Sequence, residues 1–124
     1  MIRKNNDVDI MVRRGGIYLV DLRGRVGSEQ GGLRPVVVMQ NDKGNKFSPT
    51  TIICPLTSKT KFMDVTHVML SPNDCGILQS SIVLCEQVRV IDKSRIRKKV
   101  GHIIAEDKLI DIEKKIMLSF GITA

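Results

Sequence analysis

The sequence predicts one small α+β domain, mainly β, in which short strands form a barrel-like sheet and a C-terminal amphipathic helix packs on it. The length of 124 residues suits a single domain. Short apolar runs rich in β-branched residues alternate with segments rich in Gly, Pro, Asn and Asp, a pattern typical of strands and turns. From residue 106 onward, apolar residues recur at helical spacing instead.

The chain begins with a polar, irregular segment, and we expect residues 1–12 to be an N-terminal extension before a single domain at residues 13–124. The basic start is not followed by a hydrophobic segment of signal-peptide type. No apolar run approaches the roughly 20 residues that a membrane-spanning helix needs. The sequence therefore predicts a cytoplasmic protein that does not act at a membrane.

The expected strands span residues 16–22, 36–40, 51–56, 67–70, 81–90 and 97–104. The run at 36–40 follows Pro35 and is almost continuously apolar, which indicates a buried strand. The glycine-rich segment 23–33 and the segments 41–50 and 71–74 have the composition of loops and turns. Residues 92–95 are expected to form one helical turn.

The C-terminal helix is expected to begin at Glu106. Its apolar face is formed by Leu109, Ile112, Ile116 and Phe120. Asp111 and Lys115 are spaced for an ion pair on the outer face. Gly121 is well placed to end the helix.

The net charge of +7 favours an anionic partner, but charge alone does not distinguish RNA from DNA, a membrane or an acidic protein. The cysteines (Cys54, Cys75 and Cys85) are odd in number and lack CxxC spacing, so we expect reduced thiols. His67 and His102 stand far apart without ligand-like neighbours. We therefore expect no metal site and no cofactor.

The most unusual stretch is the loop at residues 27–35. Gly31 and Gly32 allow close approach of a ligand to the backbone. Arg34 follows, and Pro35 restricts its conformation. A positioned guanidinium suits a phosphate oxygen. Taken alone, however, this segment is better explained as a flexible hairpin loop with a surface arginine than as an anion-binding site.

Two further side chains draw attention. Thr57 ends an apolar strand, where its hydroxyl either projects into a site or bonds its own backbone, the usual case for an isolated Thr. Glu86 interrupts an apolar strand and either pairs structurally, with Arg34 or Arg89, or serves in acid/base chemistry. The paired role is favoured by the sequence, and His67 is expected to be structural or exposed.

Taken in order, several segments resemble the MazF/PemK family of toxin endoribonucleases. They are residues 14–18, 27–35, 36–42, 45–50, 55–57, 66–68 and 86–92. The resemblance runs from about residue 13 to residue 121, and the ordered set is far more specific than any single segment.

The resemblance implies an SH3-like β-barrel, the fold shared by MazF, PemK and CcdB proteins, assembled as a homodimer. It also implies an mRNA interferase, which cleaves single-stranded RNA sequence-specifically without metal or ribosome and inhibits translation and growth. Attack by the 2′-OH then leaves a 2′,3′-cyclic phosphate and a 5′-OH. The matching catalytic pair is Arg34 and Thr57. Another branch of the family uses an Arg and an acidic residue two positions later. In this sequence the Arg position is Leu84, so only the acidic residue of that mechanism has a match, Glu86.

The general needs of single-stranded RNA recognition suggest which residues would bind RNA. We expect base edges and phosphates to contact Ser28, Glu29, Gln30, Gly31, Gly32, Asn41, Lys59 and Gln87. The other expected partner is a small acidic antitoxin of the MazE type, because a basic toxin is readily restrained by an acidic, poorly structured peptide.

Two alternatives belong to other functional classes. One is a DNA gyrase poison of the CcdB type, for which the Phe120-Gly121-Ile122 end is a partial match to a C-terminal Trp-Gly-Ile. The helical register argues against it by placing Phe120 on the core face. The other is a non-catalytic RNA-binding barrel, which needs the basic charge but not the pair of Arg34 and Thr57.

Overall fold

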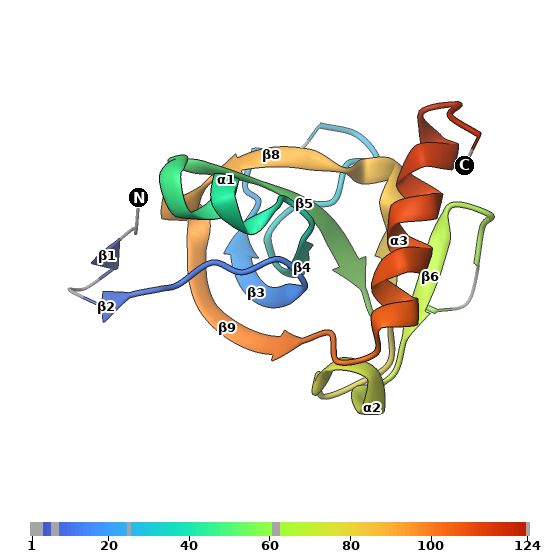
Figure 1. The fold of residues 1–124 in the computed structure, drawn as a ribbon, viewed down its shortest axis with the longest axis horizontal. Helices are drawn as coiled ribbons and strands as arrows, with labels where there is room; N and C mark the ends of the chain where they lie inside the picture. The colour runs from blue at the N-terminus through green and yellow to red at the C-terminus, as the bar shows by residue number, and fades with distance from the viewer. Residues whose placement is uncertain (1–3, 6–7, 25, 61–62, 124) are drawn as a thin grey trace.

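In the computed structural model the chain forms a strongly curved antiparallel sheet with one long helix beside it (Figure 1). The structure describes residues 4–5, 8–24, 26–60 and 63–123. None of the helices in these residues is long and apolar enough to cross a membrane.

The strands of the main sheet are β3 (Gly16–Asp21), β4 (Leu33–Val38), β5 (Thr50–Thr57), β6 (His67–Leu70), β7 (Ser81–Leu84), β8 (Arg89–Asp92) and β9 (Ile96–His102). They form a seven-stranded sheet in the order β6-β7-β5-β4-β3-β9, with β8 paired to the first half of β5. Figure 1 shows how β9 bends around one side of this sheet, which gives it a barrel-like shape. The predicted fold class is thus confirmed.

The β4 strand begins and ends earlier than predicted. It starts at Leu33, which pairs with Asp21 of β3 in spite of the glycines just before it. It ends at Val38, because the amides of Met39 and Gln40 both donate to the carbonyl of Ile52 and so break the regular ladder.

The predicted strand at 81–90 is in fact two strands joined by a short 3-10 helix, η1 (Cys85–Gln87). The β7 strand pairs with the end of β5, whereas β8 pairs with its beginning. The chain therefore turns at η1 as it passes along β5. Glu86 and Gln87 lie on this turn instead of within a strand.

Two short helices occupy segments that were predicted to be turns, α1 (Asp42–Phe47) and α2 (Pro72–Cys75). The side chain of Asn41 accepts a hydrogen bond from the amide of Gly44 (2.8 Å) and so caps α1. In α2 the capping box of Ser71 and Asp74 has the same effect. The predicted helical turn at 92–95 is confirmed as η2 (Lys93–Arg95).

The central strands are buried on both faces, which explains their continuous apolar runs. Ile17 and Val37 belong to one core, between the sheet and the C-terminal helix. Tyr18, Val36 and Val38 belong to a second core within the curve of the sheet. The cysteines are free and lie among the buried residues.

The C-terminal helix, α3 (Glu106–Ser119), confirms the predicted periodicity. Ile112 is fully buried, and Asp111 and Lys115 pair at 4.0 Å. The predicted core position of Phe120 is wrong, since this side chain is 63% exposed. The helix ends at Ser119, and the chain turns away at Gly121, whose φ is +77°.

The predicted extension contains two short strands, β1 (Lys4–Asn5) and β2 (Val8–Asp9), which form an antiparallel pair. Its last residues contact the domain. Val12 is buried in the second core, and the hydroxyl of Tyr18 donates to the carbonyl of Met11 (3.0 Å). The division of the chain at residue 12 stays a prediction.

Candidate active site

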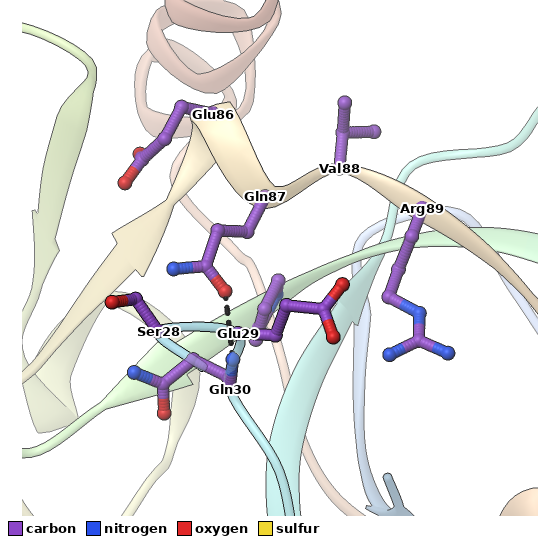
Figure 2. Close-up of a pocket in the computed structure, with 8 residues that line it drawn as sticks. Ser28, Glu29, Gln30, Glu86, Gln87, Val88 and Arg89 are labelled. Atoms are coloured by element: carbon purple, nitrogen blue, oxygen red, sulfur yellow. Dashed lines mark hydrogen bonds between the residues drawn. The ribbon is translucent and has the colours of Figure 1, made fainter. Parts of the chain in front are cut away.

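A pocket of about 610 Å³ lies between the glycine-rich loop and η1 (Figure 2). It is lined by Ser28, Glu29, Gln30, Pro55, Glu86, Gln87, Val88 and Arg89. The loop residues and the η1 residues are far apart in the sequence, and the fold brings them together. Four of them, Ser28, Glu29, Gln30 and Gln87, were predicted to bind RNA.

A hydrogen bond across the pocket joins its two sides. The backbone N–H of Gln30 donates to the side-chain oxygen of Gln87 at 2.9 Å, as Figure 2 shows. On the loop itself, the carboxylate of Glu29 accepts from the amide of Val26 (2.6 Å). These bonds hold the loop in one conformation against η1.

Arg34 lies on β4 just after the loop, opposite Val20 of β3. Its Nε donates to the carbonyl of Gly31 at 3.0 Å, which fixes the plane of the guanidinium. The side chain is half-buried. Arg34 lines a neighbouring cavity of about 400 Å³ instead of the pocket itself. Lys98 and Lys99 line the same cavity, which is therefore cationic.

Arg34 and Thr57 occupy matching positions on neighbouring strands. The β4 and β5 strands pair Val36 with Pro55 and Val38 with Ile53. The β4–β5 pairing ends at Val36 and Pro55, and Arg34 and Thr57 each lie two residues beyond this last pair. Pro55 lines the pocket, whereas Arg34 lines the neighbouring cavity and Thr57 lines neither of the two.

The hydroxyl of Thr57 accepts a hydrogen bond from the amide of Lys59 (3.2 Å). This is the local bond to the backbone that an isolated threonine commonly makes. It uses a lone pair of the oxygen, and it leaves the hydroxyl proton for a second partner. Thr57 is only 8% exposed and is the last residue of β5, so a second hydrogen-bond partner has access to its hydroxyl only at this end of the strand.

Glu86 is exposed, and its predicted pairing with Arg34 or Arg89 is wrong. Its carboxylate accepts from the hydroxyl of Thr66 (3.1 Å) and contacts Nε2 of His67 (3.2 Å). The reason is that η1 turns Glu86 out of the sheet and toward the start of β6. His67 is thus a structural partner, in agreement with the prediction.

Other predicted RNA-binding residues lie outside the pocket lining. Asn41 caps α1, and Lys59 is exposed next to Thr57. Gly31 and Gly32 precede β4, where Gly32 has a φ of +74° that favours glycine. Arg89 was missed as a pocket residue, although its position in the Glu-Gln-Val-Arg segment was a usable signal.

Among the residues that the structure describes, no group of three or more His, Cys, Asp or Glu side chains is arranged to hold a metal ion. The cationic groups near the pocket are Arg34 and Arg89, and the carboxylates are Glu29 and Glu86. This mixture provides hydrogen-bond donors and acceptors for base edges, with cations for phosphate oxygens.

Comparisons with known proteins agree on one family. The sequence profile for the PemK-like, MazF-like toxin of type II toxin–antitoxin systems matches residues 13–120. The chain is 41% identical over 113 residues to the endoribonuclease MazF of Staphylococcus epidermidis, which covers 90% of this chain and 93% of that protein.

Solved structures show the same fold. MazF from Deinococcus radiodurans superposes with a TM-score of 0.79 at 25% identity, covering 92% of this chain and 100% of that chain. A MazE–MazF complex from the same organism matches with a TM-score of 0.72 at 23% identity, covering 93% and 100%.

Proposed function

This chain belongs to the family of PemK-like, MazF-like toxins of type II toxin–antitoxin systems, and from this premise we propose that it cleaves single-stranded RNA at specific sequences without a metal ion or the ribosome. At 41% identity over most of its length to a MazF, it is an endoribonuclease. In the cell it acts in the cytoplasm, where loss of mRNA stops translation and growth.

The observation that carries this proposal is the convergence of the glycine-rich loop and η1 at one pocket. Gln30 and Gln87 offer amide groups for base edges. Arg34, which lines the neighbouring cavity, and Thr57, at the end of β5, offer a cation and a hydroxyl for the phosphate. The amide groups suit sequence readout, because unstacked bases are read by their edges, while the cation and the hydroxyl suit the phosphate.

The reaction needs no nucleophile from the protein. The 2′-OH of the ribose gives up its proton as its oxygen attacks the adjacent phosphorus. The bond from phosphorus to the 5′-oxygen breaks and that oxygen takes up a proton, so the products are a 2′,3′-cyclic phosphate and a 5′-OH. Arg34 stabilises the charge that grows on the phosphoryl oxygens, and Thr57 holds one of these oxygens or the 2′-OH. Glu86 can accept a hydrogen bond from RNA at the rim of the same pocket.

The test is cleavage of a long single-stranded RNA by the purified protein in excess EDTA. We expect cuts at a recurring short sequence, with a 2′,3′-cyclic phosphate on one product and a 5′-OH on the other. Replacing the 2′-OH by hydrogen at the scissile nucleotide should abolish the cut there. Cleavage at the 2′-deoxy position, or activity that disappears with EDTA, would contradict the mechanism.

A further inference from the structure

A tightly bonded turn precedes β6 and is centred on Asp64. The carbonyl of Asp64 accepts from the amide of His67 (3.1 Å), and its carboxylate accepts from the amide of Val65 (2.7 Å). The backbone N–H of Asp64 donates to Nδ1 of His67 at 3.0 Å. The turn therefore fixes both the backbone and the ring of His67.

These bonds determine which nitrogen of the imidazole carries its proton. A ring nitrogen that accepts from a backbone N–H has no proton of its own, so the neutral ring is protonated at Nε2. Nε2 lies 3.2 Å from Oε2 of Glu86 and donates to it. The hydroxyl of Thr66 bonds the other oxygen, Oε1, at 3.1 Å.

The carboxylate of Glu86 is thus held at both oxygens, and each oxygen keeps a lone pair for another donor. The amide of Cys85 also donates to the carbonyl of Thr66 (3.2 Å), which attaches η1 to the start of β6. The side chain of His67 is 14% exposed, while that of Glu86 is 39% exposed. The histidine therefore lies behind the carboxylate, which faces outward.

Figure 2 shows where the carboxylate points. Glu86 and Gln87 project to the same side of η1, above Ser28 and Gln30 of the loop. Glu86 lines the pocket, whereas His67 does not. The geometry separates a supporting residue from a contacting one.

We propose that His67, together with Thr66, is a positioning residue that holds the Glu86 carboxylate as an acceptor for an N–H or O–H group of the bound RNA. This role rests on the proposed ribonuclease function and deepens it. His67 acts only through Glu86, and it has no contact with the substrate. Without the imidazole, the Glu86 carboxylate rotates freely and binds water. RNA binding then has to order this carboxylate, which lowers the affinity for RNA.

The test is a double-mutant cycle with His67→Ala, Glu86→Ala and the double variant. Two quantities are measured, kcat/KM on a single-stranded RNA and the affinity for the same RNA with a 2′-deoxy scissile nucleotide. His67→Ala should lower at least one of them about tenfold, the effect of one hydrogen bond to a charged group. In the Glu86→Ala background the same change should cost less than about twofold. His67→Gln, which keeps an N–H donor, should recover part of the loss.

A second measurement does not depend on RNA. Nitrogen-15 NMR of the wild-type protein should show the Nε2–H tautomer of His67, and the Nδ1–H tautomer would overturn the proposal.

The control for the cleavage measurements is His102→Ala on β9, which removes the other imidazole without touching this network and should leave cleavage within about twofold.

The outcomes separate the two levels of inference. Equal losses from His67→Ala in both backgrounds, or no loss in either, overturn the positioning role while leaving ribonuclease activity established. Failure of the wild-type protein to cleave RNA overturns the proposed function itself, whatever the NMR shows.

Discussion

Arg34 and Thr57 lie at matching positions on adjacent strands, and we expect cleavage to depend on both. Arg34→Ala or Thr57→Val should lower kcat by about 10²–10³, because each removes a group that stabilises charge in the transition state. Stability should change little for Arg34→Ala, since the side chain is half-buried and its Nε bonds one loop carbonyl. The measurement is single-turnover cleavage, with thermal unfolding in parallel.

Matched controls exist for both variants. Arg97→Ala removes the same charge from a side chain that contacts Asp21 and does not line the pockets near Arg34. Thr57→Ser keeps the hydroxyl and should retain most activity. A normal rate for Arg34→Ala, or an equal loss for Arg97→Ala, would show that charge in general, and not the placement of Arg34, supports cleavage.

Asp42 should make stability depend on pH in the acid range. The backbone N–H of Arg14 donates to its carboxylate at 2.7 Å and lowers the pKa from the ordinary value of 3.8, with a further contribution from Asn45. Because the folded state has the lower pKa, this stabilisation is present above about pH 4 and is lost as the pH falls through the lowered value. Asp42→Asn should therefore lower the unfolding midpoint at pH 7.

The comparison with the wild type should be repeated down to pH 2. The difference in midpoint should shrink as the wild-type carboxylate becomes protonated. Asp111→Asn, which removes an equal charge from the outer face of α3, is the control. A difference that stays constant from pH 7 to pH 2 would rule out the charged form of Asp42 as its source.

Single residues also show where sequence reasoning stops. The choice of Arg34 and Thr57 came from the ordered resemblance to a family, and their catalytic role stays a prediction. The partner of Glu86 was not found, because its contact with His67 depends on η1, a turn inside what reads as one apolar strand. Hydrogen bonds between distant segments have no local signal in the sequence.

At the scale of elements, long periodic or apolar segments were predictable and short capped ones were not. The β5 strand and α3 match closely, because burial imposes a clear period on them. The α1 helix was missed, since a helix this short is decided by its cap and by tertiary contacts. Its Asn41 and Gly44 are residues that also favour turns.

Two truncations of the N-terminal segment should differ in their effect on the free energy of unfolding. Deleting residues 1–9 should leave the free energy of unfolding nearly unchanged. Deleting residues 1–12 should lower it by about 2 kcal/mol, because Val12 is 8% exposed in the second core and its loss exposes that surface. The Tyr18 hydroxyl also loses its acceptor on Met11. Urea unfolding of both truncations measures this.

The shorter deletion is the control for the longer one, as both remove the β1–β2 pair. If both cost the same, the contribution would come from that pair and not from Val12. If neither costs anything, the domain would begin at residue 13, as the sequence alone suggested.

For the whole molecule, the net charge of +7 predicts that anionic partners compete for the same surface. Relatives of this chain form complexes with the antitoxin MazE. We expect this protein to be a homodimer whose RNA-binding surface is covered by an acidic antitoxin, so that the two ligands exclude each other.

The decisive experiment is titration of the cognate antitoxin into the protein bound to a 2′-deoxy RNA analogue. RNA should be released as the antitoxin saturates, and light scattering should give the mass of a dimer bound to antitoxin. Simultaneous binding of both ligands at saturation would show that the antitoxin acts from another surface. Affinity for RNA should also fall steeply with salt.

The burial of β3 and β4 between two cores has a consequence for how such a protein can diversify. Substitutions on these strands disturb packing on one side or the other, whereas the loop before β4 and the η1 turn carry exposed residues that line the pocket. We therefore expect exposed pocket residues such as Ser28 to change with little cost in stability, whereas Glu29 and Gln87 also bond the loop backbone. The buried strands maintain the fold, so the exposed residues that line the pocket are the part of the protein that can vary.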